Sequence, residues 1–171
     1  SKFLEVPANI SKLGKTHFMG EYRGMLKDFN IKGNFYTDIG TVGADLKYIE
    51  SKQTGFKQYN GKLSASNFNI GYFLDIEQIK KISFNLKVDG SGVTKNDLQA
   101  SLTGNVDKLN VLGYDYNNII IEGDASKGKF NGYTLIEDTN IYFRFDGLLD
   151  FSTEIPSFDF VAAVENARLN K

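Results

Sequence analysis

Residues 117–150, NNIIIEGDASKGKFNGYTLIEDTNIYFRFDGLLD, decide the fold. Apolar or small side chains alternate with polar ones along this stretch, and short polar pairs such as Lys127-Gly128 and Asp138-Thr139 interrupt it. Since successive side chains of a strand point to opposite faces, each segment has one apolar face and one mostly polar face. The stretch therefore predicts strands, joined by turns so short that neighbouring strands pair antiparallel.

The same alternation extends over the second half of the chain. We expect strands at 97–106, 108–113, 116–126, 128–138, 140–150 and 157–168. Strands that follow one another so closely build a sandwich, a barrel or an open curled sheet. The predicted fold class is all-β, a curved antiparallel meander sheet that is either open and folded over like a β-taco or sandwich-like.

The first half is expected to follow the same plan. Residues 1–14 form a leading segment with one helical turn after Pro7, and residues 16–70 form a first strand group. Turns are predicted at Asp28-Phe29, at Asp38–Gly40 and at 52–55, where the turn-forming residues gather.

One short helix is predicted between the two strand groups, over 71–81. Tyr72, Phe73, Ile76 and Ile79 recur there at spacings of three and four, which is the helical period. A second strand group is expected over 82–168, with a sharp turn at 89–92 (DGSG). Residues 1–171 thus form a single β-rich segment, and its start with Ser rather than Met predicts a piece excised from a longer repetitive protein.

Composition excludes several function classes. The formal net charge of −1 and the scattered charges leave no basic patch for nucleic acid. The chain has no Cys, and the single His17 cannot build a histidine-rich metal site. Acidic pairs such as Glu137-Asp138, and Asp146 with Asp150, fall at strand ends, where turn formation explains them. We therefore expect a non-enzymatic protein without a catalytic residue, cofactor or metal.

Four motifs in the second half resemble the AsmA-like repeats. They are 116–123 (YNNIIIEG), 128–132 (GKFNG), 136–141 (IEDTNI) and 145–147 (FDG). In this pattern the chain is similar to the TamB-type (translocation and assembly module) envelope proteins of Bacteroidota-like bacteria. The resemblance is sharpest between residues 84 and 151, and it concerns strand faces and turns rather than a catalytic signature.

The resemblance implies a periplasmic cell-envelope protein, anchored in the inner membrane when full-length, with a sheet that encloses a hydrophobic groove. It further implies lipid transport between membranes or assembly of outer-membrane proteins. The implied partners are phospholipid acyl chains or unfolded outer-membrane strands, an outer-membrane assembly factor of the TamA/BamA type, and neighbouring repeats of the same chain.

The apolar side of the strands is the candidate site, and two interpretations stay open: a lipid-facing surface, or a core sealed by a second sheet or by the helix. The residues predicted to face lipid are Leu86, Val88, Leu102, Val106, Ile119, Ile121, Phe130, Ile136, Ile141, Phe143, Phe145, Phe158 and Phe160. Small residues on the same side either leave room for a ligand or allow curvature and close packing. They are Ala100, Gly104, Gly123, Ala125, Gly132, Gly147 and Ala162.

Tyrosines suggest an alternative function, a β-sandwich that acts as an adhesion or carbohydrate-binding module. Tyr114 and Tyr116 flank a turn, and Tyr133 and Tyr142 lie on the polar side of their strands. Exposed Tyr often stacks on sugars, but the chain has no Trp, and Tyr is also a common strand residue.

Overall fold

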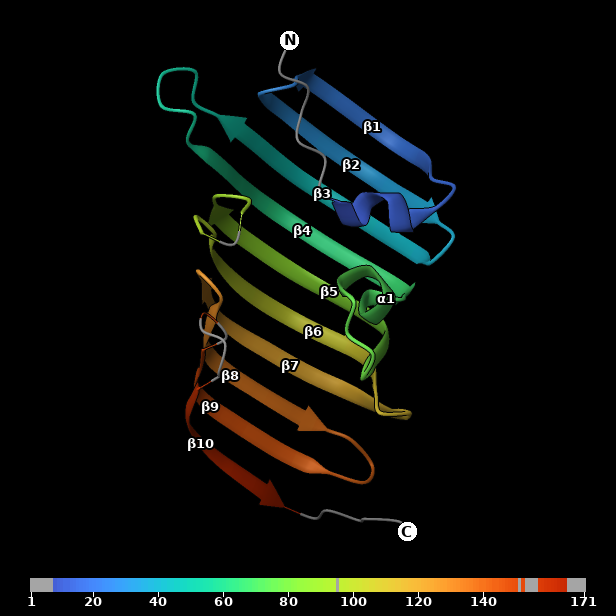
Figure 1. Cartoon of the computed structure of the whole chain (residues 1–171), viewed down its shortest axis with the longest axis vertical. Helices are drawn as coiled ribbons and strands as arrows, with labels where there is room; N and C mark the ends of the chain where they lie inside the picture. The colour runs from blue at the N-terminus through green and yellow to red at the C-terminus, as the bar shows by residue number, and fades with distance from the viewer. Residues whose placement is uncertain (1–7, 95, 151, 153–156, 166–171) are drawn as a thin grey trace.

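The computed structural model describes residues 8–94, 96–150, 152 and 157–165. Ten antiparallel strands form one sheet in which every strand pairs with its neighbours in sequence, so the meander prediction is confirmed (Figure 1). The strands are β1 (His17–Met25), β2 (Asp28–Thr37), β3 (Gly40–Glu50), β4 (Lys57–Phe68), β5 (Ile79–Ser91), β6 (Gln99–Val111), β7 (Tyr114–Ser126), β8 (Lys129–Glu137), β9 (Tyr142–Asp150) and β10 (Ser157–Glu165).

Two turn predictions and one predicted strand break are wrong, each because a strand runs through the residues concerned. Asp28 and Phe29 already belong to β2, so the β1–β2 turn is 26–27. Asp89 and Gly90 pair with β4 and β6 and lie inside β5. The predicted break near Asp107 is a β-bulge of β6 against β5, because Phe84 pairs with Val106 while the preceding Ser83 pairs with Lys108.

The helical predictions are confirmed in part. A 3-10 helix, η1 (Ala8–Leu13), provides the expected turn after Pro7, and α1 (Ile70–Leu74) begins where the short helix was expected. Asp75 takes the left-handed conformation, with φ 59° and ψ 40°, and ends α1 after one turn. Ile79 then starts β5, so the prediction of helix over 71–81 is confirmed for 71–74 and wrong for 75–81.

Lys12 joins the two helical segments. Its Nζ lies 2.5 Å from Asp75 Oδ2 and donates to the Tyr72 carbonyl at 3.2 Å, at the carboxyl end of α1, where a cation is favourable. In Figure 1, η1 and α1 both lie in front of one end of the strands near β3–β5, and most of the sheet in that view has no helix over it.

The described chain forms one layer rather than two. A chain of this length can bury a large core, yet eight apolar residues are buried, at 4–9 % exposure, and none of the described side chains is fully enclosed. The eight are Ala65, Phe68, Val88, Ala100, Val106, Ile119, Leu135 and Phe145. The sheet is open, so the sandwich and barrel alternatives are wrong for the described residues.

Candidate functional site: the apolar face of the sheet

Strand registers align the alternating residues into continuous rows. Leu63 lies opposite Leu86, Leu86 opposite Gly104 and Gly104 opposite Ile121, and the same row continues to both edges of the sheet. Four such rows cross all ten strands, and we call them the apolar face. Each strand contributes four residues to it, namely the first, third, fifth and seventh of a seven-residue range. The ranges are 18–24, 29–35, 42–48, 59–65, 84–90, 100–106, 119–125, 130–136, 143–149 and 158–164.

No residue of the apolar face is charged. Its polar groups are Thr134 and the hydroxyls of Tyr22, Tyr48 and Tyr59. Burial raises the pKa of Tyr48 and of Tyr59 above the usual 10.0, and the carboxylates of Glu50 and Asp97 respectively add to the effect. Both hydroxyls therefore stay neutral at physiological pH, and the face has no charge that would lose its hydration under an acyl chain.

Exposure differs among the predicted lipid-facing residues. Val88, Val106, Ile119 and Phe145 are buried, and because no second layer covers the described sheet, neighbouring side chains of the same face must shield them. Phe160 of β10 is 46 % exposed. The half-buried members are Leu86, Leu102, Ile121, Phe130, Ile136, Ile141 and Phe143.

Two of the predicted residues differ from the rest in their position. Ile141 lies between β8 and β9 rather than in a strand, because it exchanges backbone hydrogen bonds with Asp138 across the connection. Phe158 belongs to β10 by its backbone, opposite Leu149, and its side chain lies outside the described part of the structure.

Aromatic rings fill the space above the small residues. Gly123 and Gly132 lie opposite each other, and a Cβ added to either would come within 2.7–3.0 Å of the Phe130 ring. Gly20 and Gly33 repeat this arrangement with the Phe18 ring at 2.9 Å. The glycines therefore allow close ring packing on the sheet, which favours the packing interpretation over an empty ligand channel at these positions.

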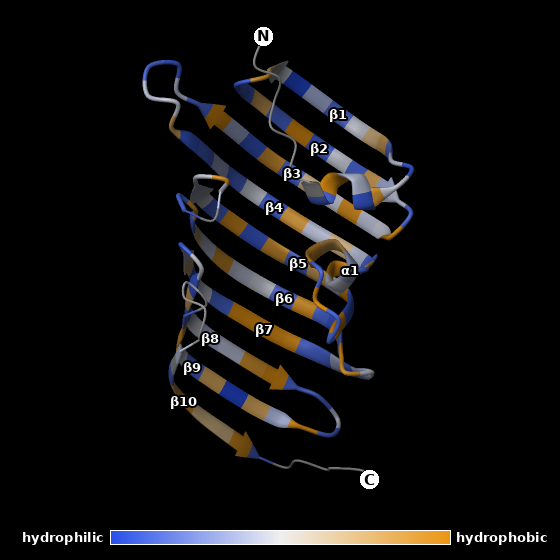
Figure 2. Ribbon diagram, viewed as in Figure 1, coloured by the Kyte–Doolittle hydropathy of each residue, from blue (hydrophilic) through white to orange (hydrophobic). Residues whose placement is uncertain are grey.

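The first half of the sheet contributes residues that the sequence analysis did not select. The rings of Tyr22, Phe29 and Tyr48 stack across β1, β2 and β3, with centroids 5.1 and 5.0 Å apart. The signal was present, since 29–35 (FNIKGNF) alternates as clearly as the second half. Figure 2 shows hydrophobic and hydrophilic residues alternating along strands in both halves.

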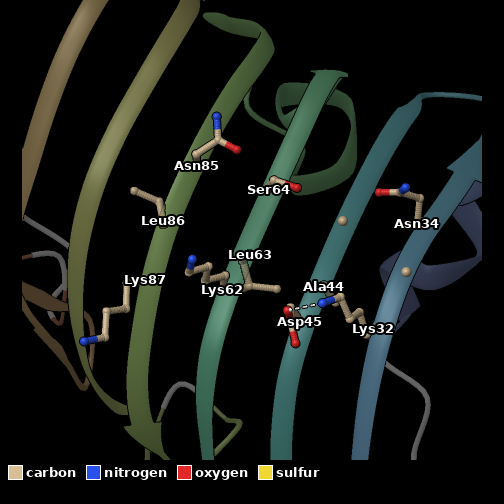
Figure 3. A pocket seen from close by; sticks show the side chains of 12 residues that line it. Lys32, Asn34, Ala44, Asp45, Lys62, Leu63, Ser64, Asn85, Leu86 and Lys87 are labelled. Atoms are coloured by element: carbon tan, nitrogen blue, oxygen red, sulfur yellow. Dashed lines mark ion pairs between the residues drawn. The ribbon is translucent and has the colours of Figure 1, made fainter. Parts of the chain in front are cut away.

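The opposite face is polar and contains a hollow of about 540 Å³ over β2–β5. Figure 3 shows Lys32, Asp45, Lys62 and Lys87 around it, and Lys32 Nζ lies 3.3 Å from Asp45 Oδ2. None of the described residues that line it is aromatic, so the hollow offers no ring on which a sugar would stack.

The tyrosines of the alternative function have other partners. Tyr133 lies under Arg144, whose guanidinium is 5.3 Å from the ring centroid. Tyr114 donates to Asp138, which also accepts from the backbone of Asn117 and Asn140. These hydrogen bonds, that of Tyr114 foremost, hold the pKa of Asp138 at about 2. Asp138 thus holds the β8–β9 connection against β7 and caps the turn at Asn140.

The described residues offer no group of three or more His, Cys, Asp or Glu that would hold a metal ion. The His17 ring stacks on Tyr36, with centroids 6.3 Å apart. Among the helices in the described part of the chain, none has the length and apolar character to cross a membrane. Comparison of the chain with protein-family models, with curated proteins and with solved structures found no match.

Proposed function

We propose that the apolar face binds the acyl chains of lipids, within a non-enzymatic cell-envelope protein of the AsmA/TamB type. The observation that carries this proposal is the uncharged surface that crosses all ten strands without a second layer over it in the described structure. Soluble monomers rarely leave contiguous apolar patches larger than a few hundred Å² uncovered, so such a face indicates an interaction site.

The chemistry of the face suits a conduit better than a selective pocket. Each methylene group that leaves water contributes about 0.8 kcal/mol, which retains a long chain without any polar contact. The rows consist of apolar and small residues with three tyrosines and one threonine, so an acyl chain meets no charged group that would hold it at one place. Unfolded outer-membrane strands, which alternate apolar and polar residues, are the second ligand that this surface would accept.

Two adjacent isoleucines of β7 give a matched test. Ile121 lies on the apolar face, and Ile120, which is 40 % exposed, lies on the polar face. We expect Ile121→Asp to reduce binding of a fluorescent fatty acid at least tenfold, about the effect of losing two buried methylene groups. Ile120→Asp should bind as the parent protein does.

Far-UV circular dichroism shows whether both variants keep the sheet, and Ile121→Thr, which favours strands, replaces Ile121→Asp if that variant unfolds. Organic extraction of the purified parent protein should release phospholipid. Equal binding by the Ile120 and Ile121 variants, or a folded parent protein that binds no fatty acid, would refute the proposal.

The carbohydrate alternative has less support, because its predicted sandwich is absent from the described structure and the polar hollow has no aromatic lining. A glycan array distinguishes the two functions, since binding there together with no fatty-acid binding would favour the alternative.

A further inference from the structure

The hollow on the polar face gathers three lysines that the proposed function does not use. It measures about 540 Å³ and lies over β2–β5, which are inner strands of the sheet. The strand registers place Lys32, Asp45, Lys62 and Lys87 in one row, each opposite the next, although they lie far apart in the sequence. With three lysines and one aspartate this row carries a formal charge of +2, whereas the whole chain carries −1.

Two of these lysines have no counter-charge in the described structure. Asp45 lies opposite both Lys32 and Lys62, and its Oδ2 pairs with Lys32 Nζ at 3.3 Å. Figure 3 shows the Lys62 side chain extending toward β5 instead. Neither Lys62 nor Lys87 has an ion pair or a side-chain hydrogen bond with another described residue. Because like charges directly opposite on neighbouring strands repel each other, the Lys62–Lys87 pair destabilises the sheet unless an anion joins it.

Neutral polar groups lie beside the lysines. The next row across the same strands consists of Asn34, Gly43, Ser64 and Asn85, which also line the hollow. Gly43 is buried, and a Cβ there would lie 2.3 Å from Ser64 Oγ and 3.0 Å from Asn34 Oδ1. The glycine therefore keeps the floor of the hollow open between these two side chains. Within the described residues, the side chains of Asn34 and Ser64 have no hydrogen-bond partner, so both can donate to a ligand.

We propose that the hollow binds a phosphate group, free or as a phosphate ester, between Lys62 and Lys87. A phosphate monoester carries a charge of about −1.5 to −2 at pH 7, so one group neutralises both ammonium groups, whereas a carboxylate neutralises only one. Lysine binds phosphate as a point charge, and the Ser64 hydroxyl and the Asn34 amide donate to the remaining oxygens. The acyl chains of the proposed function lie on the opposite face, so this site is independent of that function.

NMR titration of the backbone amides with inorganic phosphate, and separately with glycerol 3-phosphate, measures the affinity. We expect each of Lys62→Gln and Lys87→Gln to raise the dissociation constant about tenfold, because each removes a charged hydrogen-bond donor. Lys52→Gln removes the same charge from the exposed β3–β4 connection and should leave the dissociation constant unchanged. The tighter of the two ligands shows whether the site takes free phosphate or a phosphate ester.

Thermal unfolding in a phosphate-free buffer separates a binding site from a stabilising role of the lysines. Phosphate at ten times its dissociation constant should raise the midpoint of the parent protein by about 3–6 °C more than sodium chloride of equal ionic strength. Without phosphate, Lys87→Gln should unfold at a higher temperature than the parent, because it removes the repulsion from Lys62.

Three results would overturn the proposal. They are equal responses of the parent midpoint to phosphate and to chloride, a Lys87→Gln variant that binds phosphate as tightly as the parent, and a Lys87→Gln variant that is less stable than the parent without phosphate. Fatty-acid binding by the apolar face would survive any of them, so the two proposals fail separately.

Discussion

Ile120 and Ile121 are consecutive residues of β7 that point to opposite faces of one sheet, and those faces differ in almost every side chain. The row through Ile121 contains Leu63, Leu86 and Phe145, whereas the row through Ile120 mixes polar residues with a few apolar ones such as Leu135. The polar row includes Asn34, Ser64, Asn85, Asn105 and Arg144. In a globular protein a second layer would explain the apolar row, but here the described structure has one layer. An apolar row without a covering layer is what the proposed function requires, since bound acyl chains would take the place of that layer.

The largest difference between the faces should appear at the adjacent residues Phe145 and Arg144 of β9. Phe145 is 6 % exposed on the apolar face, so Phe145→Ala should lower the free energy of unfolding by about 3 kcal/mol. Arg144 is exposed on the polar face, and its contact with the Tyr133 ring accounts for about 0.5–1 kcal/mol. Urea unfolding of both alanine variants measures the contrast, and equal losses would contradict it.

The next largest effect concerns the close packing at the glycines. A Cβ at Gly132 would lie 2.3 Å from the Glu122 carbonyl oxygen and 3.0 Å from the Phe130 ring. Gly132→Ala should therefore cost about 2 kcal/mol through overpacking. Asn131→Ala, next to it on the polar face, should stay within about 0.5 kcal/mol. A Gly132→Ala variant as stable as the parent in thermal unfolding would show that the ring does not need the glycine.

Acid should lower the free energy of unfolding through the polar regions, whereas the affinity of the apolar face for fatty acid should stay the same. The pKa of Asp138 falls from 3.8 to about 2 on folding, so its hydrogen bonds stabilise the protein above pH 4. This contribution is lost as the pH falls from about 4 to about 2, and Asp138→Asn should flatten the stability profile in that window. Fatty-acid binding by the folded fraction should stay constant between pH 7 and about 5, because the apolar face has no carboxylate.

The smallest expected change in stability comes from a substitution in the polar hollow. Lys32 and Asp45 form an exposed ion pair at 3.3 Å, and such pairs contribute about 0–1 kcal/mol. Lys32→Ala should change the unfolding midpoint only slightly, and added salt should reduce even that difference. A loss as large as that of Phe145→Ala would mean that the polar face contributes to the fold as strongly as the apolar one.

Much of this architecture could be predicted from alternation alone. The period of two through Ile119, Ile121, Phe143 and Phe145 correctly assigned strand type, face and antiparallel neighbours. Residues 71–81 show the limit of that approach, because their apolar spacing suits a helix while Asp75 ends α1 in a left-handed conformation. The strand break expected at Asp107 was wrong for a related reason, since a bulge against β5 absorbs one residue without ending β6.

The candidate site was predicted less completely than the fold. Alternation identified which residues share a face, but the packing of Phe18 and Phe130 over glycines depends on the register of neighbouring strands. Whether the apolar face is covered depends on the number of layers in the fold. A strand shows the same alternation of apolar and polar residues in a one-layer sheet and in a two-layer sandwich, so the sequence pattern does not distinguish them.

Single cysteines at Ile120 and Ile121 test the central claim, an uncovered apolar face, most directly, because the parent chain has no Cys. Each variant is modified with a polarity-sensitive fluorophore, with and without phospholipid vesicles. We predict that both thiols react in the folded protein and that vesicles shift the emission of the label at 121 to shorter wavelength but not that at 120. A thiol at 121 that reacts only after denaturation, or labels that respond alike to vesicles, would contradict the account.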